Sequence, residues 1–170
     1  MAGYGLTNEQ HLSVVLQNNL SLEGHNIEII NGSVSGSTSA GGLNIAEWTL
    51  SEPSIDLMIL CLGANDMLRG INPKETKNNL EEIIKIAKSK NIKVIIAGMI
   101  APTSYGFEYK KSFDTIFSDL SKKYKLQLIP FLLEGVAQKP EFNLSDGMHP
   151  NDQGTIIIGN TLKKAILENL

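Results

Sequence analysis

The sequence is poor in the features that define several classes of protein. It has a single cysteine, Cys61, which excludes a disulfide framework and a cysteine-based metal cluster. Cys61 lies inside an apolar run, so we expect a small buried hydrophobic residue. No apolar run approaches the ~18 residues of a membrane-spanning helix, and we therefore expect no integral membrane segment. The residues after Met1 do not have the pattern of a secretory signal peptide.

An excess of positive charge is also absent. The 15 lysines and arginines are balanced by 18 acidic residues, and the formal net charge is −3. Without a basic block, nucleic acid is not an expected partner. The chain of 170 residues is long enough to bury a sizeable core, and we expect residues 1–170 to form a single domain.

Apolar residues follow two alternating periodicities along the chain. Continuous or β-branched apolar runs, typical of strands, lie at residues 27–30, 57–62, 93–98 and 127–131. Helical spacing of apolar residues occurs at 11–20, 40–50, 73–90, 109–123 and 151–167. Strands that alternate with helices predict an α/β fold with a parallel sheet and right-handed crossovers. Such sheets bind ligands beyond the carboxyl ends of their strands.

Three polar segments fall in the expected loops, at residues 32–39, 63–66 and 146–149. The third has a carboxylate, Asp146, three residues before an imidazole, His149. At that spacing an Asp146 oxygen can accept the Nδ1 proton of His149, which leaves Nε2 free to take a proton from a nucleophile. The alternative interpretation is a turn with a capping aspartate and a surface histidine.

Together these segments resemble the SGNH branch of the GDSL hydrolases, and the similarity covers nearly the whole chain. Residues 31–39 resemble the block that carries the oxyanion-hole glycine, here Gly36. Gly63-Ala64-Asn65-Asp66 resembles the GxND block, whose oxyanion-hole asparagine is Asn65. Residues 146–151 resemble the DGxHPN block with its catalytic aspartate and histidine. The flanking residues 68–70 and 129–131 are similar to those of small bacterial thioesterase/lysophospholipase/arylesterase proteins.

The resemblance implies a three-layer α/β/α fold with a flavodoxin-like parallel sheet, and hydrolysis through an acyl-enzyme. Asp146 would orient His149, the general base, and the Gly36 N–H and Asn65 amide would stabilise the oxyanion. The substrate would be a small-molecule ester or thioester, such as an acyl-CoA, a lysophospholipid or an aryl ester. No cofactor and no metal are implied. Because relatives are often exported, the resemblance favours a periplasmic or secreted location; without an upstream signal peptide the location would be cytoplasmic.

Residues next to the GxND block, and residues on another loop after a strand, are candidates for substrate contact or for simple packing. The four that would line an acyl site are Met67, Leu68, Tyr105 and Phe107. Asp66 is expected to be structural, and Arg69 to be a solvated loop charge rather than a substrate contact.

The chain departs from the family pattern at two places. Ser37 stands where the subgroup usually has aspartate, which should change a loop hydrogen bond and not the chemistry. The family nucleophile lies in Gly-Asp-Ser-Leu at the end of the first strand, and the resemblance places that motif immediately before residues 2–6. We therefore expect this chain to be N-terminally incomplete, without the first strand and the nucleophilic serine, and to fold poorly as it stands.

Two other functions stay open at this point. A non-catalytic lipid- or carbohydrate-binding relative fits a chain without the nucleophile. A flavodoxin-like nucleotide or flavin binder would use residues 35–42 as a phosphate-binding nest, but would leave the DGxHPN and GxND blocks unexplained. A metal site on Asp146 and His149 is disfavoured because no third ligand stands out.

Overall fold

The computed structural model describes residues 3–170, which group into two compact units. One unit comprises Gly36–Phe131. The other comprises the described residues up to Ser35 together with Leu132–Leu170. Each unit has its own helices and its own buried apolar residues.

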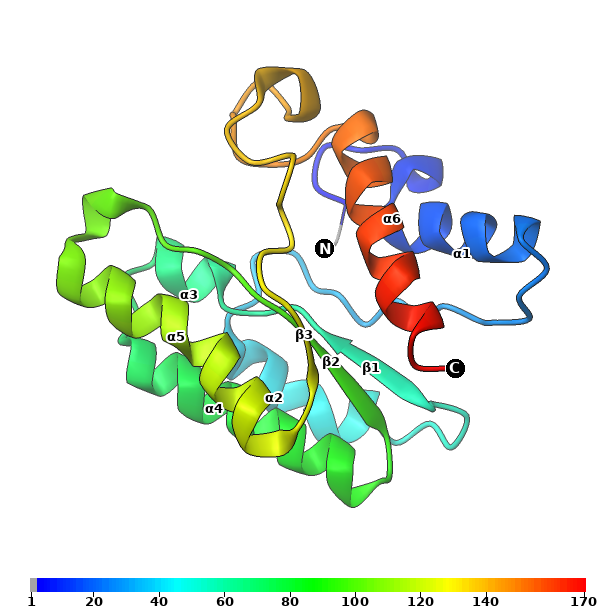
Figure 1. The fold of residues 1–170 in the computed structure, drawn as a ribbon, viewed down its shortest axis with the longest axis horizontal. Coiled ribbons are helices and arrows are strands. Elements are labelled where there is room, and N and C mark those ends of the chain that lie inside the picture. Colours follow the sequence, from blue (N-terminus) through cyan, green and yellow to red (C-terminus); the bar gives the residue numbers. More distant parts are fainter. Residues whose placement is uncertain (1–2) are drawn as a thin grey trace. The chain divides into compact units, whose positions relative to one another are not determined.

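The unit Gly36–Phe131 is built on a parallel sheet of three strands in the order β1-β2-β3 (Figure 1). The strands are β1 (Leu57–Leu60), β2 (Lys93–Ala97) and β3 (Gln127–Ile129). Leu57 of β1 is opposite Lys93 of β2, and Ile95 of β2 is opposite Gln127 of β3. The predicted parallel α/β arrangement of these three strands is therefore confirmed.

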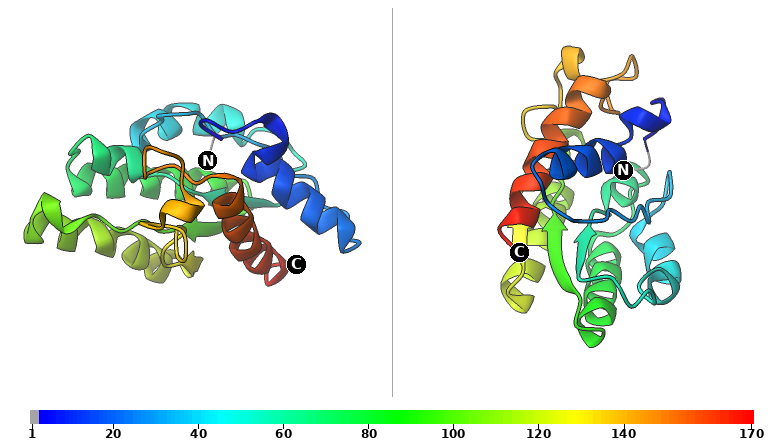
Figure 2. Two further views of the ribbon diagram at one scale, coloured as in Figure 1. Left: turned by 90° about the horizontal axis from the view of Figure 1, so that it is seen from above. Right: turned by 90° about the vertical axis from the view of Figure 1, so that its right-hand side faces the viewer.

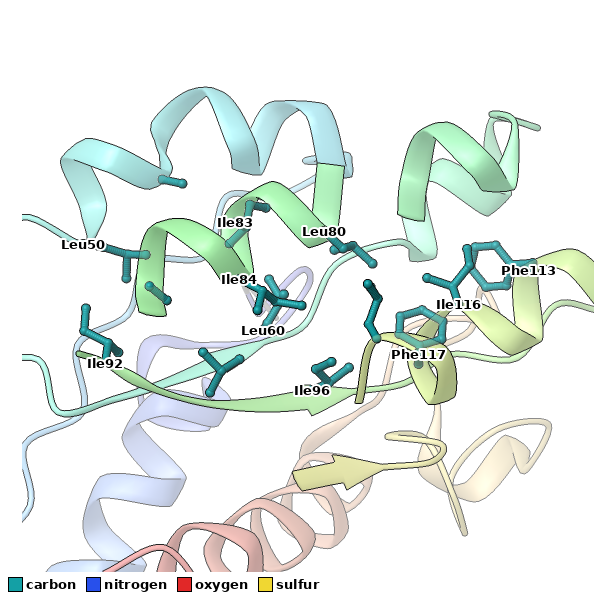
Figure 3. Close-up of a cluster of buried hydrophobic side chains, with 14 of the residues drawn as sticks. Leu50, Leu60, Leu80, Ile83, Ile84, Ile92, Ile96, Phe113, Ile116 and Phe117 are labelled. Atoms are coloured by element: carbon teal, nitrogen blue, oxygen red, sulfur yellow. The ribbon is translucent and has the colours of Figure 1, made fainter. Parts of the chain in front are cut away.

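Helices α2 (Ser39–Thr49), α4 (Pro73–Ser89) and α5 (Phe107–Tyr124) bury their apolar side chains with those of the sheet. Figure 3 shows this core, in which Leu60 and Ile96 of the strands meet Ile84 of α4 and Phe117 of α5. Pro73 begins α4, where proline loses no intrahelical hydrogen bond, and the Asn72 side chain caps it by accepting from the Lys74 amide. The helices predicted from apolar spacing at 40–50, 73–90 and 109–123 are confirmed.

The other unit contains α1 (Leu12–Leu22) and α6 (Asp152–Leu167), with short 3₁₀ turns η1 (Asn8–Gln10) and η3 (Pro140–Phe142). Helices α1 and α6 lie against each other, as both views of Figure 2 show. Gly159 of α6 faces α1, and a Cβ added there would lie 3.5 Å from Val15. A Cβ at this position would make only ordinary van der Waals contact, so the packing of the two helices does not depend on glycine here.

Two expectations about local structure are wrong. Residues 27–30 do not form a paired strand; instead the Gln17 amide donates to Ile27 O (2.7 Å) and accepts from Ile29 N (2.8 Å). A strand requires a neighbour that supplies a ladder of donors and acceptors, and here one glutamine side chain supplies one of each. Residues 63–66, expected as a loop, begin a short helix, α3 (Ala64–Leu68).

The sequence also predicts that Cys61 is buried and that no helix spans a membrane. Cys61 follows β1 and is only partly buried, and this burial raises the pKa of its thiol. Within residues 3–170, no helix combines the length and the apolar character needed to cross a membrane. The loop between β2 and α5 holds a 3₁₀ turn, η2 (Thr103–Tyr105).

Candidate active site

The chain turns sharply at the carboxyl end of β1 and begins α3. Gly63, the residue before α3, has a φ of 111°, a conformation that residues with a side chain rarely adopt. A Cβ at Gly63 would also lie 3.3 Å from Phe117 Cζ, a tight contact, so the conformation favours glycine and the space around it is narrow. The sharp turn places Asn65 and Asp66 in the first turn of α3.

Side chains in and just after α3 hold the loop that leads into α2. Asn65 Nδ2 donates to Ser37 O (3.0 Å), and Arg69 Nη2 donates to Gly36 O (2.9 Å). Two successive carbonyl groups of the loop are therefore fixed from one short segment. Arg69 is exposed, as expected of a solvated loop charge, and its guanidinium also binds the backbone carbonyl of the candidate oxyanion-hole glycine.

Asp66 is the third anchor of this loop and is fully buried. Its Oδ2 accepts from the Ser39 amide (2.7 Å), and its Oδ1 accepts from the Ser39 hydroxyl and from Thr76 Oγ1 (3.1 Å). Asn79 Nδ2 donates to the Ser39 hydroxyl oxygen (3.0 Å) and completes the network. Asp66 thus joins α2, α3 and α4, which confirms the expected structural role.

Gly36 lies in this loop with a φ of 73°. A Cβ at this position would find Arg69 Nη2 at 3.8 Å as its nearest neighbour, so space is not the constraint. The positive φ is what favours glycine here. Gly36 and Asn65, the two candidate oxyanion-binding residues, belong to the same unit and are linked through Ser37.

The candidate dyad is formed within the other unit. Asp146 Oδ2 lies 2.7 Å from His149 Nδ1. Asp146 Oδ1 accepts from the amides of Met148 (2.9 Å) and His149 (3.0 Å), so the two oxygens have separate tasks. One oxygen shapes the loop and the other binds the imidazole. The remaining nitrogen, Nε2, is the one that can exchange a proton with a reacting group.

These hydrogen bonds have an electrostatic consequence for Asp146. Donation from the His149 and Met148 amides, followed by the His149 side chain, lowers the Asp146 pKa from 3.8 to about 2. The carboxylate form is therefore maintained throughout the neutral range. An ionised acceptor next to Nδ1 is what a dyad of this kind requires.

The lowered Asp146 pKa predicts a pH-dependent contribution to stability. Because the folded-state pKa lies below the ordinary value, the contribution is fully present above pH ~3.8 and is lost as the pH falls towards ~2. Thermal unfolding of the wild type and of Asp146→Ala should therefore differ most above pH ~4, and the difference in Tm should shrink in stronger acid. A difference that is independent of pH across this interval would contradict the assignment.

The four apolar candidates for substrate contact differ in how available their side chains are. Met67 packs against the core of its unit, and Tyr105 stacks on Tyr109 with ring centroids 5.3 Å apart. Leu68 is 51 % exposed and Phe107 is 74 % exposed. Leu68 follows β1 and Phe107 follows β2, so both lie in segments beyond the carboxyl ends of strands.

Two amides of the loop at residues 35–42 already have acceptors and are not free to form a phosphate-binding nest. The Ser39 amide donates to the Asp66 carboxyl group, and the Gly41 amide donates to Thr38 Oγ1 (3.3 Å). A phosphate would have to displace both acceptors and approach a buried carboxyl group. The interpretation as a nucleotide binder is therefore not favoured.

Sequence reasoning missed one contact of the dyad. The Tyr4 ring lies against the His149 ring, with centroids 4.5 Å apart. The available signal was the glycine on each side of Tyr4, which indicates a tight turn but not what the turn contacts.

Known proteins match this chain over most of its length. Residues 1–155 match the family described as GDSL-like Lipase/Acylhydrolase. The sequence is 34 % identical to an arylesterase of Vibrio mimicus, over 99 % of this chain and 84 % of the relative. It is 32 % identical to thioesterase 1/protease 1/lysophospholipase L1 of Escherichia coli K12, over 81 % of this chain and 66 % of the relative.

Solved structures agree with the sequence matches. The crystal structure of TesA superposes with a TM-score of 0.93 at 32 % identity and covers 99 % of this chain and 94 % of its own. That of AlinE4, described as an SGNH-hydrolase family esterase, gives a TM-score of 0.81 at 36 % identity, over 99 % and 90 %. This chain belongs to the GDSL-like lipase/acylhydrolase family. Its fold is the three-layer α/β/α fold of SGNH hydrolases.

Proposed function

We propose that the protein hydrolyses carboxylic esters or thioesters through a serine acyl-enzyme, with His149 as general base and Asp146 as its orienting partner. The observation that carries the proposal is the 2.7 Å contact between Asp146 Oδ2 and His149 Nδ1. The contact fixes the Nδ1–H tautomer, so Nε2 can accept the serine proton and later donate it to the leaving group. A non-catalytic relative would have no need of this arrangement.

The oxyanion of the tetrahedral intermediate is assigned to the Gly36 N–H and the Asn65 amide. Asn65 Nδ2 has two hydrogens, and one is donated to Ser37 O. That bond orients the amide, and the second hydrogen can bind the oxyanion. Arg69 binds Gly36 O and limits movement of the same loop. Preorganised donors of this kind need no rearrangement when negative charge develops.

The proposed nucleophile is the serine of a Gly-Asp-Ser-Leu segment placed before residues 2–6. The serine oxygen attacks the acyl carbon, and the alcohol or thiol leaves with the proton from His149. Water then attacks the acyl-serine with His149 again as base, which releases the carboxylic acid and restores the serine. In each half of the reaction, the proton that His149 takes from the serine or from water is the proton that it then gives to the departing oxygen or sulfur.

The acyl part of the substrate is proposed to be apolar. Leu68 and Phe107 expose apolar surface on segments that follow β1 and β2. Related proteins are described as an arylesterase and as a thioesterase and lysophospholipase, whose substrates all contain an acyl group. We propose aryl esters, acyl thioesters and lysophospholipids as the substrates to test.

The test compares the 170-residue chain with an extended form that has an N-terminal strand ending in Gly-Asp-Ser-Leu. Hydrolysis of a short p-nitrophenyl ester should occur only in the extended form and should be lost in its His149→Ala variant. Activity of the 170-residue chain would contradict the nucleophile assignment. Inactivity of an extended form that unfolds cooperatively would contradict the proposed function on this class of ester.

Replacement of Asn65 by alanine in the extended form is expected to lower kcat about 10²–10³-fold, because an oxyanion donor is lost. Arg69→Ala is the matched control, since each variant removes one anchor of the same loop. The loss of an anchor alone should lower kcat no more than about tenfold. Equal effects on kcat would mean that Asn65 acts only by holding the loop.

A further inference from the structure

A tight turn at the start of the described chain packs against the candidate dyad. The Leu6 amide donates to Gly3 O (3.0 Å), and Gly3 and Gly5 have φ values of 74° and 72°. Positive φ at both positions is the conformation for which glycine is favoured. The turn leaves Tyr4 between two residues that have no side chain.

The two glycines also allow the turn to sit close to its neighbours. A Cβ added at Gly3 would lie 2.2 Å from His11 Cδ2, and one added at Gly5 would lie 2.7 Å from Leu144 Cδ1. Leu144 in turn donates its amide to His149 O (2.7 Å). The turn is therefore seated directly on the loop that presents the imidazole.

Tyr4 places its ring against His149 from this turn. The ring centroids are 4.5 Å apart and the planes are inclined by 35°. The His149 side chain is 43 % exposed, and within residues 3–170 its described side-chain hydrogen bond is the one to Asp146. One bond at Nδ1 fixes an edge of the imidazole but does not by itself prevent the ring from rocking. A second support on the face of the ring is needed to hold its plane.

We propose that Tyr4 is a positioning residue that holds the imidazole plane of His149 and so keeps Nδ1 on Asp146 Oδ2. This proposal rests on the proposed role of His149 as general base. The aromatic ring also suits the reaction electrostatically, because His149 becomes a cation when it takes the serine proton. A cation within about 6 Å of an aromatic centroid is attracted to the face of the ring.

Nuclear magnetic resonance of the ¹⁵N-labelled extended form tests this placement without any need for hydrolysis. At a pH well above ~6.5, the ordinary pKa of a free imidazole, the two His149 nitrogens should have the ¹⁵N chemical shifts of the Nδ1–H tautomer. In Tyr4→Leu these shifts should move towards each other as the ring loses its fixed plane. Tyr4→Phe, which keeps the ring and loses the hydroxyl, should retain the wild-type shifts.

A second measurement covers the case in which Tyr4→Leu disturbs the whole turn. Cross-relaxation between Tyr4 ring protons and His149 ring protons is expected in the unaltered chain, and its absence would overturn the proposal. Unchanged His149 nitrogen shifts in Tyr4→Leu would overturn it as well. His25 serves as the reference imidazole, since its signals should be the same in all three proteins.

Kinetics of the extended form supply the functional measurement. Tyr4→Leu should lower kcat about threefold to tenfold with little change in KM, and Tyr4→Phe should restore it. A kcat for Tyr4→Leu equal to that of the wild type would overturn the positioning role. If no form hydrolyses esters, the proposed function fails, and the nitrogen shifts alone still decide whether Tyr4 holds the imidazole.

Discussion

Replacement of Asp146 by asparagine in the extended form is expected to lower kcat about 10⁴-fold and to leave the loop folded. The effect on kcat and the effect on the loop can be separated because each carboxylate oxygen has its own hydrogen-bond partners. An asparagine Oδ1 can still accept from the amides of Met148 and His149, as the Asp146 oxygen does. The other atom becomes an NH₂ group facing His149 Nδ1, where an acceptor stood. The imidazole must then present a lone pair at Nδ1 and a hydrogen at Nε2, which cannot accept the serine proton.

Asp146→Ala is the comparison that separates catalysis from folding. It removes both the loop acceptor and the partner of Nδ1, so it should lower kcat and also lower the Tm. Asp146→Asn should lower kcat with a much smaller change in Tm above pH ~4, where the wild-type carboxyl group is ionised. Retention of more than about a tenth of the wild-type kcat in Asp146→Asn would mean that the Asp146 carboxylate does not set the His149 tautomer.

The elements with a long and regular apolar pattern could be predicted from the sequence. Helix α4 combines Pro73 at its start with a regular apolar stripe, and β2 is apolar over almost all of its length. Both signals are local, so they do not depend on the rest of the chain. Residues 27–30 have a similar composition, but a strand depends on a neighbour that no local pattern specifies. There the Gln17 side chain takes the backbone groups instead.

The candidate site was predictable to the extent that its contacts are short in sequence. Asp146 and His149 are three residues apart, so their hydrogen bond follows from the spacing. Arg69 binds Gly36, and Tyr4 contacts His149 from the opposite end of the chain. Contacts between such distant positions are decided by tertiary packing, for which a glycine-rich turn or a loop arginine gives no specific signal.

Replacement of Asp66 by alanine is expected to lower the free energy of unfolding by about 3–5 kcal/mol. The side chain is fully buried and is the acceptor for the Ser39 amide, the Ser39 hydroxyl and Thr76 Oγ1. Each buried donor left without an acceptor costs about 1–3 kcal/mol. Against a usual total of about 5–15 kcal/mol, the loss is large enough to shift a urea midpoint clearly.

Asp119→Ala is the matched control, because it also removes an aspartate that is paired in the structure. Asp119 lies 2.7 Å from Lys77, but its side chain is 47 % exposed, so the loss should be below about 1 kcal/mol. Thr76→Val, which removes one donor of the Asp66 network, should fall between the two. If Asp66→Ala is no more destabilising than Asp119→Ala, Asp66 does not hold α2, α3 and α4 together. If Asp66→Ala is strongly destabilising, the buried carboxyl group that stabilises the fold also holds the loop that contains Gly36. Stability and oxyanion binding then both depend on Asp66.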